Sequence, residues 1–463
     1  MILLLALVVA IAFACFVVVT TLPLAQQRPV VPVLLLCASF PLGLQSVGFS
    51  LKLVQLAVLV VVAIVAFLRL SSGGPPLGWT KILWLPVAIV VLAVLSTPGS
   101  IDPALSEKQD IIFVLGLLLI CCVVGAVRTM SDVRMILLGL LVAGDVICLT
   151  AVVGAGTFTV QFSGAVVNNR VHGIFTQPND FGSFSAAVLC IAMGLALTQR
   201  QRGVRVVAGV STAIAAAAVA VSLSRGAMIG VGLAVIGFAV LLPRIRWRVV
   251  GITGIAVGCL AVSSAAHIGP TQVQVLGARL TSAFSGNDNP NDARTAAWHE
   301  ALREIGVRPL LGFGPNGFPE ASAGANGIGS AGNDFSVNRA LGIDHAHNVL
   351  LTVAAELGLV AASAVVAFSL ALGLRLLRTI RTTSSPDDAG IAIACAGGLL
   401  SFVGHGLVDY TLRDAMILIP LCLITGCAVA ATFARSGPDR PDPSRAVGVA
   451  GEPVAAAATG FEQ

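Results

Sequence analysis

Two histidines and a glutamate make the stretch DHAHNVLLTVAAELG, residues 344–358, the clearest candidate for chemistry. His345 and His347 stand directly before an apolar run, and Glu356 follows nine residues after His347. An unperturbed histidine is half protonated near about pH 6.5, so either ring could take a proton from a substrate hydroxyl. The two rings could instead be metal ligands or hydrogen-bonded structural groups. A catalytic zinc ion needs a third protein ligand, and no neighbouring polar segment offers an obvious one, so we predict no metal site.

Three arginines form a second candidate group. Arg170 opens RVHGIFTQPNDFGSF, Arg225 lies between two apolar runs in VSLSRGAMIG, and Arg294 lies in NPNDARTAAWHEALREIG. A charge this close to hydrocarbon is costly unless it faces protein, water or a ligand, and the guanidinium fork suits an anion. We predict that Arg225 and Arg294, assisted by Arg170, bind an anion. The alternatives are a snorkelling anchor at Arg225, a structural role at Arg170 and a solvated Arg294.

The elements that hold these residues must be membrane helices. Hydrophobic residues make up 57% of the 463, charged residues 11%, and the mean hydropathy is +0.96. A soluble domain normally has about a quarter of its residues charged, so this composition excludes one. Most apolar runs have 16 to 22 residues, enough to cross a hydrocarbon core of roughly 30 Å. The sequence therefore predicts an all-α polytopic membrane protein with 12 or 13 transmembrane helices.

The predicted spans follow the apolar runs. They are residues 2–22, 30–45, 51–69, 82–97, 111–127, 134–155, 181–198, 204–222, 226–243, 247–266, 348–374, 389–408 and 415–434. The first run lacks a basic N-terminal region and is longer than a signal sequence usually is, so we interpret it as a span. Pro32 and Pro41 make the second run short enough to be re-entrant. The ten cysteines lie in or beside these runs, and we predict no disulfide framework and no zinc site among them.

Arginine-rich connections alternate with arginine-poor ones, which assigns the sides of the membrane. By the positive-inside rule the arginine-rich connections face the cytoplasm, so Arg170, Arg225, Arg294, His347 and Arg413 share the outer side. We predict a multi-pass protein of the cytoplasmic (inner) membrane whose site faces the extracytoplasmic side. The predicted organisation is transmembrane helices 1–10 in residues 1–266, a large extracytoplasmic loop in 267–347, transmembrane helices 11–13 in 348–434, and a disordered cytoplasmic tail in 435–463.

The large loop should contain an amphipathic helix near residues 292–305, capped by Asn291 or Asp292. Its apolar stripe is Ala297, Trp298, Ala301, Leu302 and Ile305, which predicts that the helix lies on the bundle or on the lipid interface. Trp298 follows Arg294 by one turn and could provide an aromatic platform beside it. The motif GFGPNG follows no strand, so we interpret it as a tight turn and not as a dinucleotide site.

The buried carboxyl groups are predicted to be structural. Glu356 lies about 13 Å down its helix from His347 and must face the bundle interior, as must Asp145. We also predict four supporting residues around His347: His345, Asn348, Trp298 and Glu356.

At these residues the chain resembles the O-antigen ligase and O-antigen polymerase superfamily. The resemblance lies in order and spacing: the SRGA turn at residues 224–227, then Arg294 with Trp298 and GFGPNGF, then His347-Asn348, nine further residues and Gly358. The stretch from Arg170 fits as well, and the resemblance covers roughly residues 160–415. Ala361 departs from the glycine that the family often has.

The resemblance implies a GT-C-like membrane glycosyltransferase that uses a polyprenyl-diphosphate-linked glycan donor. It implies arginine at the positions of Arg225 and Arg294 and histidine at the position of His347. We expect inverting, metal-independent transfer to a glycan or glycolipid acceptor, with the bilayer as a partner and with no cofactor or nucleic acid. The absence of a DxD motif and of a carboxylate near residues 46–50 disfavours metal-dependent nucleotide-sugar enzymes and carboxylate-base enzymes.

Two other classes remain open, and neither ligase nor polymerase activity is favoured over the other. A transporter or flippase of an anionic lipid-linked or polysaccharide substrate would need charges along a path across the bilayer. Here Asp145 and Glu356 are the only deep charges, and the others gather on the outer side. The third class is a non-catalytic assembly protein.

Overall fold

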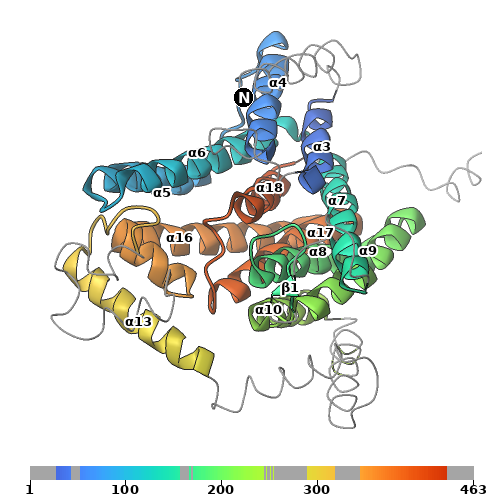
Figure 1. Ribbon diagram of the computed structural model, residues 1–463. Coiled ribbons are helices and arrows are strands. Elements are labelled where there is room, and N and C mark those ends of the chain that lie inside the picture. The colour runs from blue at the N-terminus through green and yellow to red at the C-terminus, as the bar shows by residue number, and fades with distance from the viewer. Residues whose placement is uncertain are drawn as a thin grey trace, which may run out of the picture.

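The protein is a bundle of long helices (Figure 1). The structure, a computed structural model, describes residues 28–42, 53–156, 166–167, 170–243, 289–318 and 345–434, with residues 247, 251 and 254. The predicted span 2–22, most of the predicted span 247–266, residues 267–288 and 319–344 of the large loop, and the tail from residue 435 lie outside the described residues. The eleven other predicted spans each contain a helix.

The described helices run in the order of the chain. They are α3 (Val30–Ser39), α4 (Leu53–Ser71), α5 (Trp84–Ser96), α6 (Pro103–Ala126), α7 (Met130–Gly156), α8 (Pro178–Thr198), α9 (Arg202–Ser222), α10 (Arg225–Leu241), α13 (Asn289–Val307), α16 (Val349–Thr382), α17 (Pro386–Gly406) and α18 (Ala415–Ala431). Short 3₁₀ helices are η1 (Phe40–Leu42), η2 (Lys81–Leu83) and η3 (Thr97–Gly99). The strands β1 (Val166–Val167) and β2 (Arg170–Val171) pair antiparallel, with Val167 opposite Arg170.

These helices make the chain a multi-pass membrane protein. Eight helices are long and apolar enough to cross a bilayer, and α3, α10 and α18 are shorter apolar helices. Helix α6 begins at Pro103, earlier than the apolar run predicts, because Asp102 caps it by accepting a hydrogen bond from Leu105 N. Within the predicted span 30–45, residues 30–39 form a helix of ten residues, and a 3₁₀ turn containing Pro41 follows it.

Small residues bring the ends of α10 and α17 together. A Cβ on Gly404 would lie 2.7 Å from Gly230 Cα, and one on Gly230 would lie 2.3 Å from Ser401 O. Such contacts are typical of closely packed membrane helices. They hold the first residue of α10, Arg225, near the turn that follows α17.

Helix α16 is broken where the sequence predicts an uninterrupted span. Gly358 has φ 85° and ψ 168°, outside the helical region, and the helix continues on both sides of it. The turn after α13 enters this break: Phe313 N donates to Ala355 O (3.1 Å), and Gly314 N donates to Glu356 O (2.9 Å). The turn therefore donates hydrogen bonds to the Ala355 and Glu356 carbonyl groups, which lie at the break in the helix.

Candidate functional site

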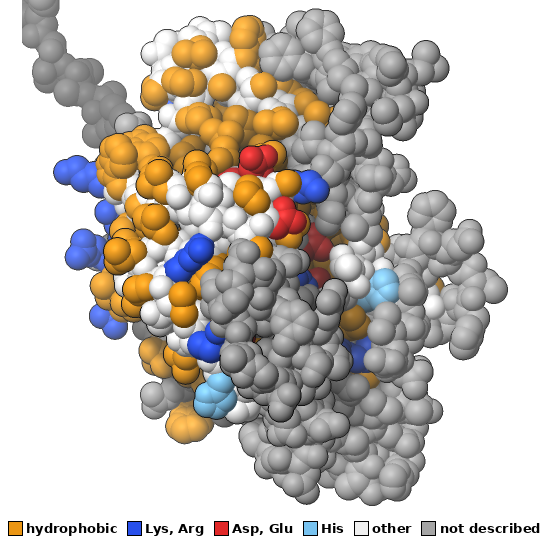
Figure 2. Space-filling view, turned by 60° about the vertical axis from the view of Figure 1, so that its left-hand side comes forward, with side chains coloured by type: hydrophobic (Ala, Val, Ile, Leu, Met, Phe, Trp, Pro, Cys, Tyr) orange, Lys and Arg blue, Asp and Glu red, His pale blue; other side chains and the backbone are white. Residues whose placement is uncertain are grey.

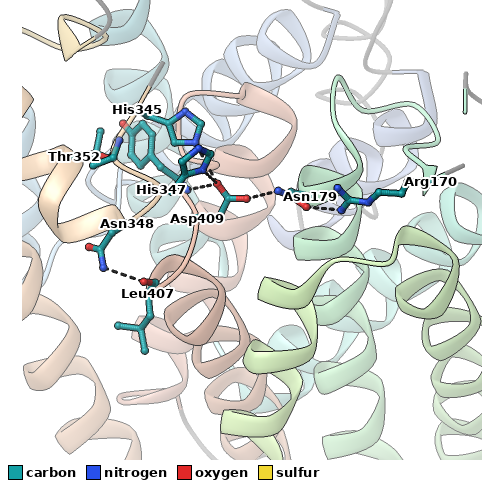
Figure 3. Close-up of polar contacts among 10 residues, drawn as sticks. Arg170, Asn179, His345, His347, Asn348, Thr352, Leu407 and Asp409 are labelled. Atoms are coloured by element: carbon teal, nitrogen blue, oxygen red, sulfur yellow. Dashed lines mark hydrogen bonds and ion pairs between the residues drawn. The ribbon is translucent and has the colours of Figure 1, made fainter. Parts of the chain in front are cut away.

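The histidine, aspartate and arginine side chains of the candidate site come from five separate elements. His345 and His347 lie in the segment that leads into α16, and Asp409 lies in the turn between α17 and α18. Arg225 begins α10, Arg294 lies on α13 and Arg170 lies in β2. Figure 3 shows the two histidines and Arg170 on opposite sides of Asp409, connected to it by polar contacts.

Asp409 is the centre of the hydrogen-bond network. Its Oδ1 lies 3.2 Å from His345 Nε2 and 3.1 Å from His347 Nδ1, and it accepts from Tyr410 N at 2.9 Å. Its Oδ2 accepts from Asn179 Nδ2 at 2.5 Å. Both carboxylate oxygens of this buried residue are thus occupied by donors.

These donors keep Asp409 ionised. Burial by itself would raise the pKa of the Asp409 carboxyl, but the hydrogen bonds from His345 and His347 and the nearby charge of His405 outweigh it. The net effect holds the pKa well below its usual range. A fixed negative charge therefore lies between the two histidine rings and Asn179 throughout the neutral pH range.

The contact with Asp409 fixes how His347 can act. An ionised carboxylate only accepts hydrogen bonds, so the neutral His347 ring carries its proton on Nδ1 and leaves Nε2 as the basic nitrogen. The His347 side chain is 26% exposed, whereas that of His345 is 4% exposed. The backbone of His347 has φ 49°, a left-handed conformation that is uncommon outside glycine and often occurs at functional sites.

The residues after His347 hold it in place. Asn348 caps α16 by accepting from Leu351 N (3.0 Å), and its Nδ2 donates to Leu407 O (3.0 Å). The buried Thr352 hydroxyl accepts from Ala346 N at 3.3 Å. The predicted supporting residue Asn348 therefore ties the start of α16 to the end of α17.

Arg170 contacts protein groups that lead to Asp409. Its Nε donates to Ser222 O at 3.0 Å, at the end of α9, and its Nη2 donates to Asn179 Oδ1 at 2.5 Å. Asn179, in the first turn of α8, thus connects Arg170 to Asp409. These contacts favour the structural alternative for Arg170.

Arg225 and Arg294 lie close enough to influence each other. Ser224 caps α10 by accepting from Ala227 N, which places Arg225 at the first position of the helix. Burial and the charge of Arg225 lower the pKa of Arg294, and Asp409 opposes the shift. A Cβ on Gly226 would lie 2.9 Å from His405 Cδ2 of α17, so any larger residue at position 226 would displace the His405 ring. The charges of Arg225 on α10 and of Asp409 therefore both act on Arg294 on α13.

Trp298 and Glu356 are the other two predicted supporting residues. Trp298 is 38% exposed, on a different face of α13 from the buried Ala297 and Ala301, so the predicted stripe is divided between two faces. Glu356 is buried beneath the site, where its carboxyl accepts from the backbone N–H groups of Asn316 and Phe318 and lies beside Tyr410. This set of contacts is that of a structural group.

The site also provides the third metal ligand that the sequence did not reveal. Ligand atoms of His345, His347 and Asp409 lie within 4.8 Å of one another, a grouping that could hold a metal ion. The expectation that no outer segment offers a third ligand is therefore wrong, because Asp409 is 62 residues beyond His347 in sequence and adjacent to it in space.

The sequence did not identify Asp409 or Asn179 as parts of the site, and it named Gly358 without indicating a helix break there. A signal for Asp409 was present, because it is a carboxylate at the outer end of a span that carries His405. Nothing in the local sequence indicates that this carboxylate meets His347.

Comparison with known proteins gives one match. A family model described as O-antigen ligase matches residues 210–366. The matched region contains Arg225, Arg294 and His347 and ends before Asp409, so it is narrower than the resemblance predicted from the motifs. No curated protein matches the chain.

Proposed function

We propose that the protein is a membrane glycosyltransferase of surface polysaccharide biosynthesis, because the O-antigen ligase model matches residues 210–366, which contain Arg225, Arg294 and His347. It transfers a glycan from a polyprenyl-diphosphate-linked donor to an acceptor hydroxyl. The observation that carries this proposal is the His347–Asp409 pair beside Arg225 and Arg294. It offers a base and an anion site within one cluster of elements.

The arginines act on the donor. A diphosphate is already a good leaving group, so the protein has chiefly to hold it and to neutralise the charge that grows on it as the bond breaks. Arg225 and Arg294 come from different helices, and the charge of Arg225 acts on Arg294. The negative charge of the donor diphosphate offsets the repulsion between the two guanidinium groups. Arg170 acts indirectly, by holding Asn179 against Asp409.

His347 acts on the acceptor. Its Nε2 takes the hydroxyl proton, the acceptor oxygen forms a bond to the anomeric carbon, and the bond from that carbon to the diphosphate oxygen breaks. The electron pair of that bond leaves with the polyprenyl diphosphate, and attack from the opposite face inverts the anomeric centre. Asp409 stabilises the imidazolium that forms, which is the role of an aspartate paired with a catalytic histidine.

The site faces the extracytoplasmic side of the cytoplasmic membrane in this proposal, and the reaction uses no metal. The alternation of arginine-rich connections supports this orientation. The predicted partners are the lipid-linked donor, a glycan or glycolipid acceptor and the bilayer. Polymerase and ligase activity differ in the acceptor and share the donor.

The test is to combine the purified full-length protein in nanodiscs with a polyprenyl-diphosphate-linked glycan and a set of acceptors. Release of polyprenyl diphosphate that depends on both the acceptor and His347 is expected. The exposed His299 on α13 provides the control, and His299→Ala should release the lipid at the wild-type rate. Movement of intact donor across a liposome membrane without release would replace the transferase by the flippase.

A further inference from the structure

Helix α13 has two apolar faces. One packs on the protein: Ala297 and Ala301 are fully buried and form a cluster with Phe318, Ala346 and Ala355. The other is open: Leu302 is 58% exposed and Trp298 38% exposed. A single amphipathic stripe on a helix lying on a soluble surface would leave only polar residues on the open face. The open face of α13 therefore faces something other than bulk water.

The open face becomes more apolar toward the end of the helix. Its first exposed residues are Thr295, Trp298 and His299, of which two are polar. Beyond Leu302 the exposed large side chains are Val307, Leu310 and Leu311, and Leu310 is 68% exposed. Arg303 lies between them but is paired with Glu300 through its guanidinium group. The gradient resembles that of a segment with one end in the headgroup region and the other in hydrocarbon.

The apolar end is fixed against two membrane helices. Leu359 N of α16 donates to Pro309 O at 2.8 Å, and the Ser96 hydroxyl of α5 donates to Leu311 O. The nearest part of α16 is the break at Gly358, where a Cβ would lie 2.0 Å from Leu310 O. The depth of Leu310 and Leu311 can therefore be measured along α5 and α16.

Both helices place this contact inside the hydrocarbon. Gly358 stands 17 residues before Arg375, the first basic residue at the other end of α16, which is about 26 Å at 1.5 Å per residue. Ser96 stands 15 residues after Lys81, or about 23 Å. The η2 turn, which contains Lys81, also packs against α16. Both lengths are below the roughly 30 Å hydrocarbon thickness, and any tilt shortens the depth they span.

Leu310 and Leu311 also continue the lipid-facing surface of these helices. At the same level α5 exposes Val94 and Leu95, and α16 exposes Leu359 and Val360. Figure 2 shows one face of the molecule, on which hydrophobic side chains cover much of the described surface and Lys and Arg side chains lie among them. The exposed side chains of the turn thus belong to the surface that two membrane helices present to lipid.

We propose that the second half of α13 and the turn through Leu311 are inserted in the outer leaflet, and that lipid acyl chains cover their open face. This segment is then not an aqueous loop element but an interfacial helix that descends toward α5 and α16. Trp298, midway along it, lies where tryptophan is enriched in membrane proteins. The inference rests on exposure and depth and is independent of the reaction proposed above.

Site-directed nitroxide labelling tests the insertion. Single cysteines replace Leu302, Leu310 and Thr295 in the full-length chain, with its native cysteines substituted and the protein in nanodiscs. Val360 on α16 gives the lipid reference, and the exposed Lys108 at the start of α6 gives the aqueous reference. Collision rates with oxygen, which concentrates in lipid, and with a nickel chelate, which stays in water, are then compared.

Labels at Leu302 and Leu310 should meet oxygen more often than the nickel chelate, as the label at Val360 does, and Leu310 should be the deeper of the two. The label at Thr295 should meet the chelate more often than either. Two results would overturn the proposal. A label at Leu310 that behaves like the one at Lys108 would place the turn in water. Low collision rates with both reagents would mean that protein covers it.

Discussion

At the scale of single residues, the account depends on Asp409 more than on either histidine. Its two oxygens accept from His345, His347, Tyr410 N and Asn179, so every predicted acid–base group is positioned against this one carboxylate. The sequence singles out His347 because a histidine at the mouth of a span is rare, and in the structure its ring contacts Asp409. It could not predict Asp409, because pairing between residues 62 positions apart is set by how α16 and α17 pack.

Replacing Asp409 by asparagine should separate positioning from proton transfer. The amide keeps the shape of the side chain but no longer requires a proton on His347 Nδ1, and it cannot stabilise the imidazolium. We expect Asp409→Asn to lower the rate of transfer by about 10²-fold or more while donor affinity stays close to that of the wild type. Stopped-flow or single-turnover release of the lipid diphosphate measures the rate.

Asp132→Asn is the matched control. Asp132 lies in the first turn of α7 and accepts hydrogen bonds from the backbone N–H groups of Arg128 and Thr129. If Asp409→Asn transferred at the wild-type rate, His347 would not need the carboxylate, and the dyad would be structural only.

Glu304 provides a pH-dependent prediction. It is fully buried on α13, and burial, with the charges of Glu300 and Glu356, raises its pKa to about 10, against a smaller opposing effect of Arg303. A folded-state pKa above the unfolded value of about 4.3 means that stability is greatest below that value and falls as the pH rises toward about 10. Glu304→Gln removes this dependence, because glutamine stays neutral.

We therefore expect Glu304→Gln to raise the melting temperature by about 2 °C or more at pH 8.5 and by less at pH 5. Thermal unfolding in detergent at the two pH values measures it. Glu300→Gln, at the partly exposed ion pair with Arg303, should change little at either pH. An equal effect of Glu304→Gln at both pH values would mean that Glu304 does not titrate in the folded protein as described.

At the scale of elements, the turn after α13 connects the arginine-bearing helix to the histidine-bearing helix. Its N–H groups bind the carbonyl groups that α16 releases at Gly358, and the Arg308 guanidinium lies 4.5 Å from the Phe313 ring and donates to Gly99 O at 2.6 Å. Sequence analysis predicted the turn from its glycines and the helices from their apolar runs. The break in α16 at Gly358 was not predicted, because a single glycine inside an apolar run is compatible with a continuous helix.

Gly358→Ala should disrupt this connection. Alanine is disfavoured at φ 85°, and its Cβ would lie 2.0 Å from Leu310 O, so stability should fall by more than about 1 kcal/mol. Transfer should fall as well, because α13 carries Arg294 and α16 follows His347. Gly373→Ala, in the helical part of α16 with open space around its Cβ, is the control and should be neutral or slightly stabilising. Equal behaviour of the two variants in thermal unfolding would show that the break is not required.

At the scale of the whole molecule, the described helices bring His345, His347 and Asp409 together from segments far apart in the sequence. The apolar runs predicted an all-α multi-pass protein, and the eight long apolar helices confirm it. What the runs could not predict is which ends meet, since that follows from contacts between small residues such as Gly230 and Gly404. Charges gathered at one end suit a reaction there better than a path across the bilayer.

Metal removal tests the chemistry of the whole site. The grouping of His345, His347 and Asp409 has the ligands of a metal centre, whereas the proposed reaction needs none of that chemistry. We expect transfer to persist after exhaustive treatment with EDTA, and added zinc to give no increase. Loss of activity with EDTA and its return with zinc, manganese or magnesium would make the three residues metal ligands and remove His347 as the base.

The central claim is that the arginines hold the donor and His347 moves the proton. The most direct test measures donor affinity and turnover together for Arg294→Ala and His347→Ala, with Arg303→Ala and His299→Ala as controls. Arg294→Ala should weaken donor binding and slow transfer, and Arg294→Lys should recover only part of both, since lysine keeps the charge and loses the fork. His347→Ala should bind donor nearly as the wild type does and transfer roughly 10²–10⁴-fold more slowly. A folded His347→Ala protein that transfers at the wild-type rate would contradict the account.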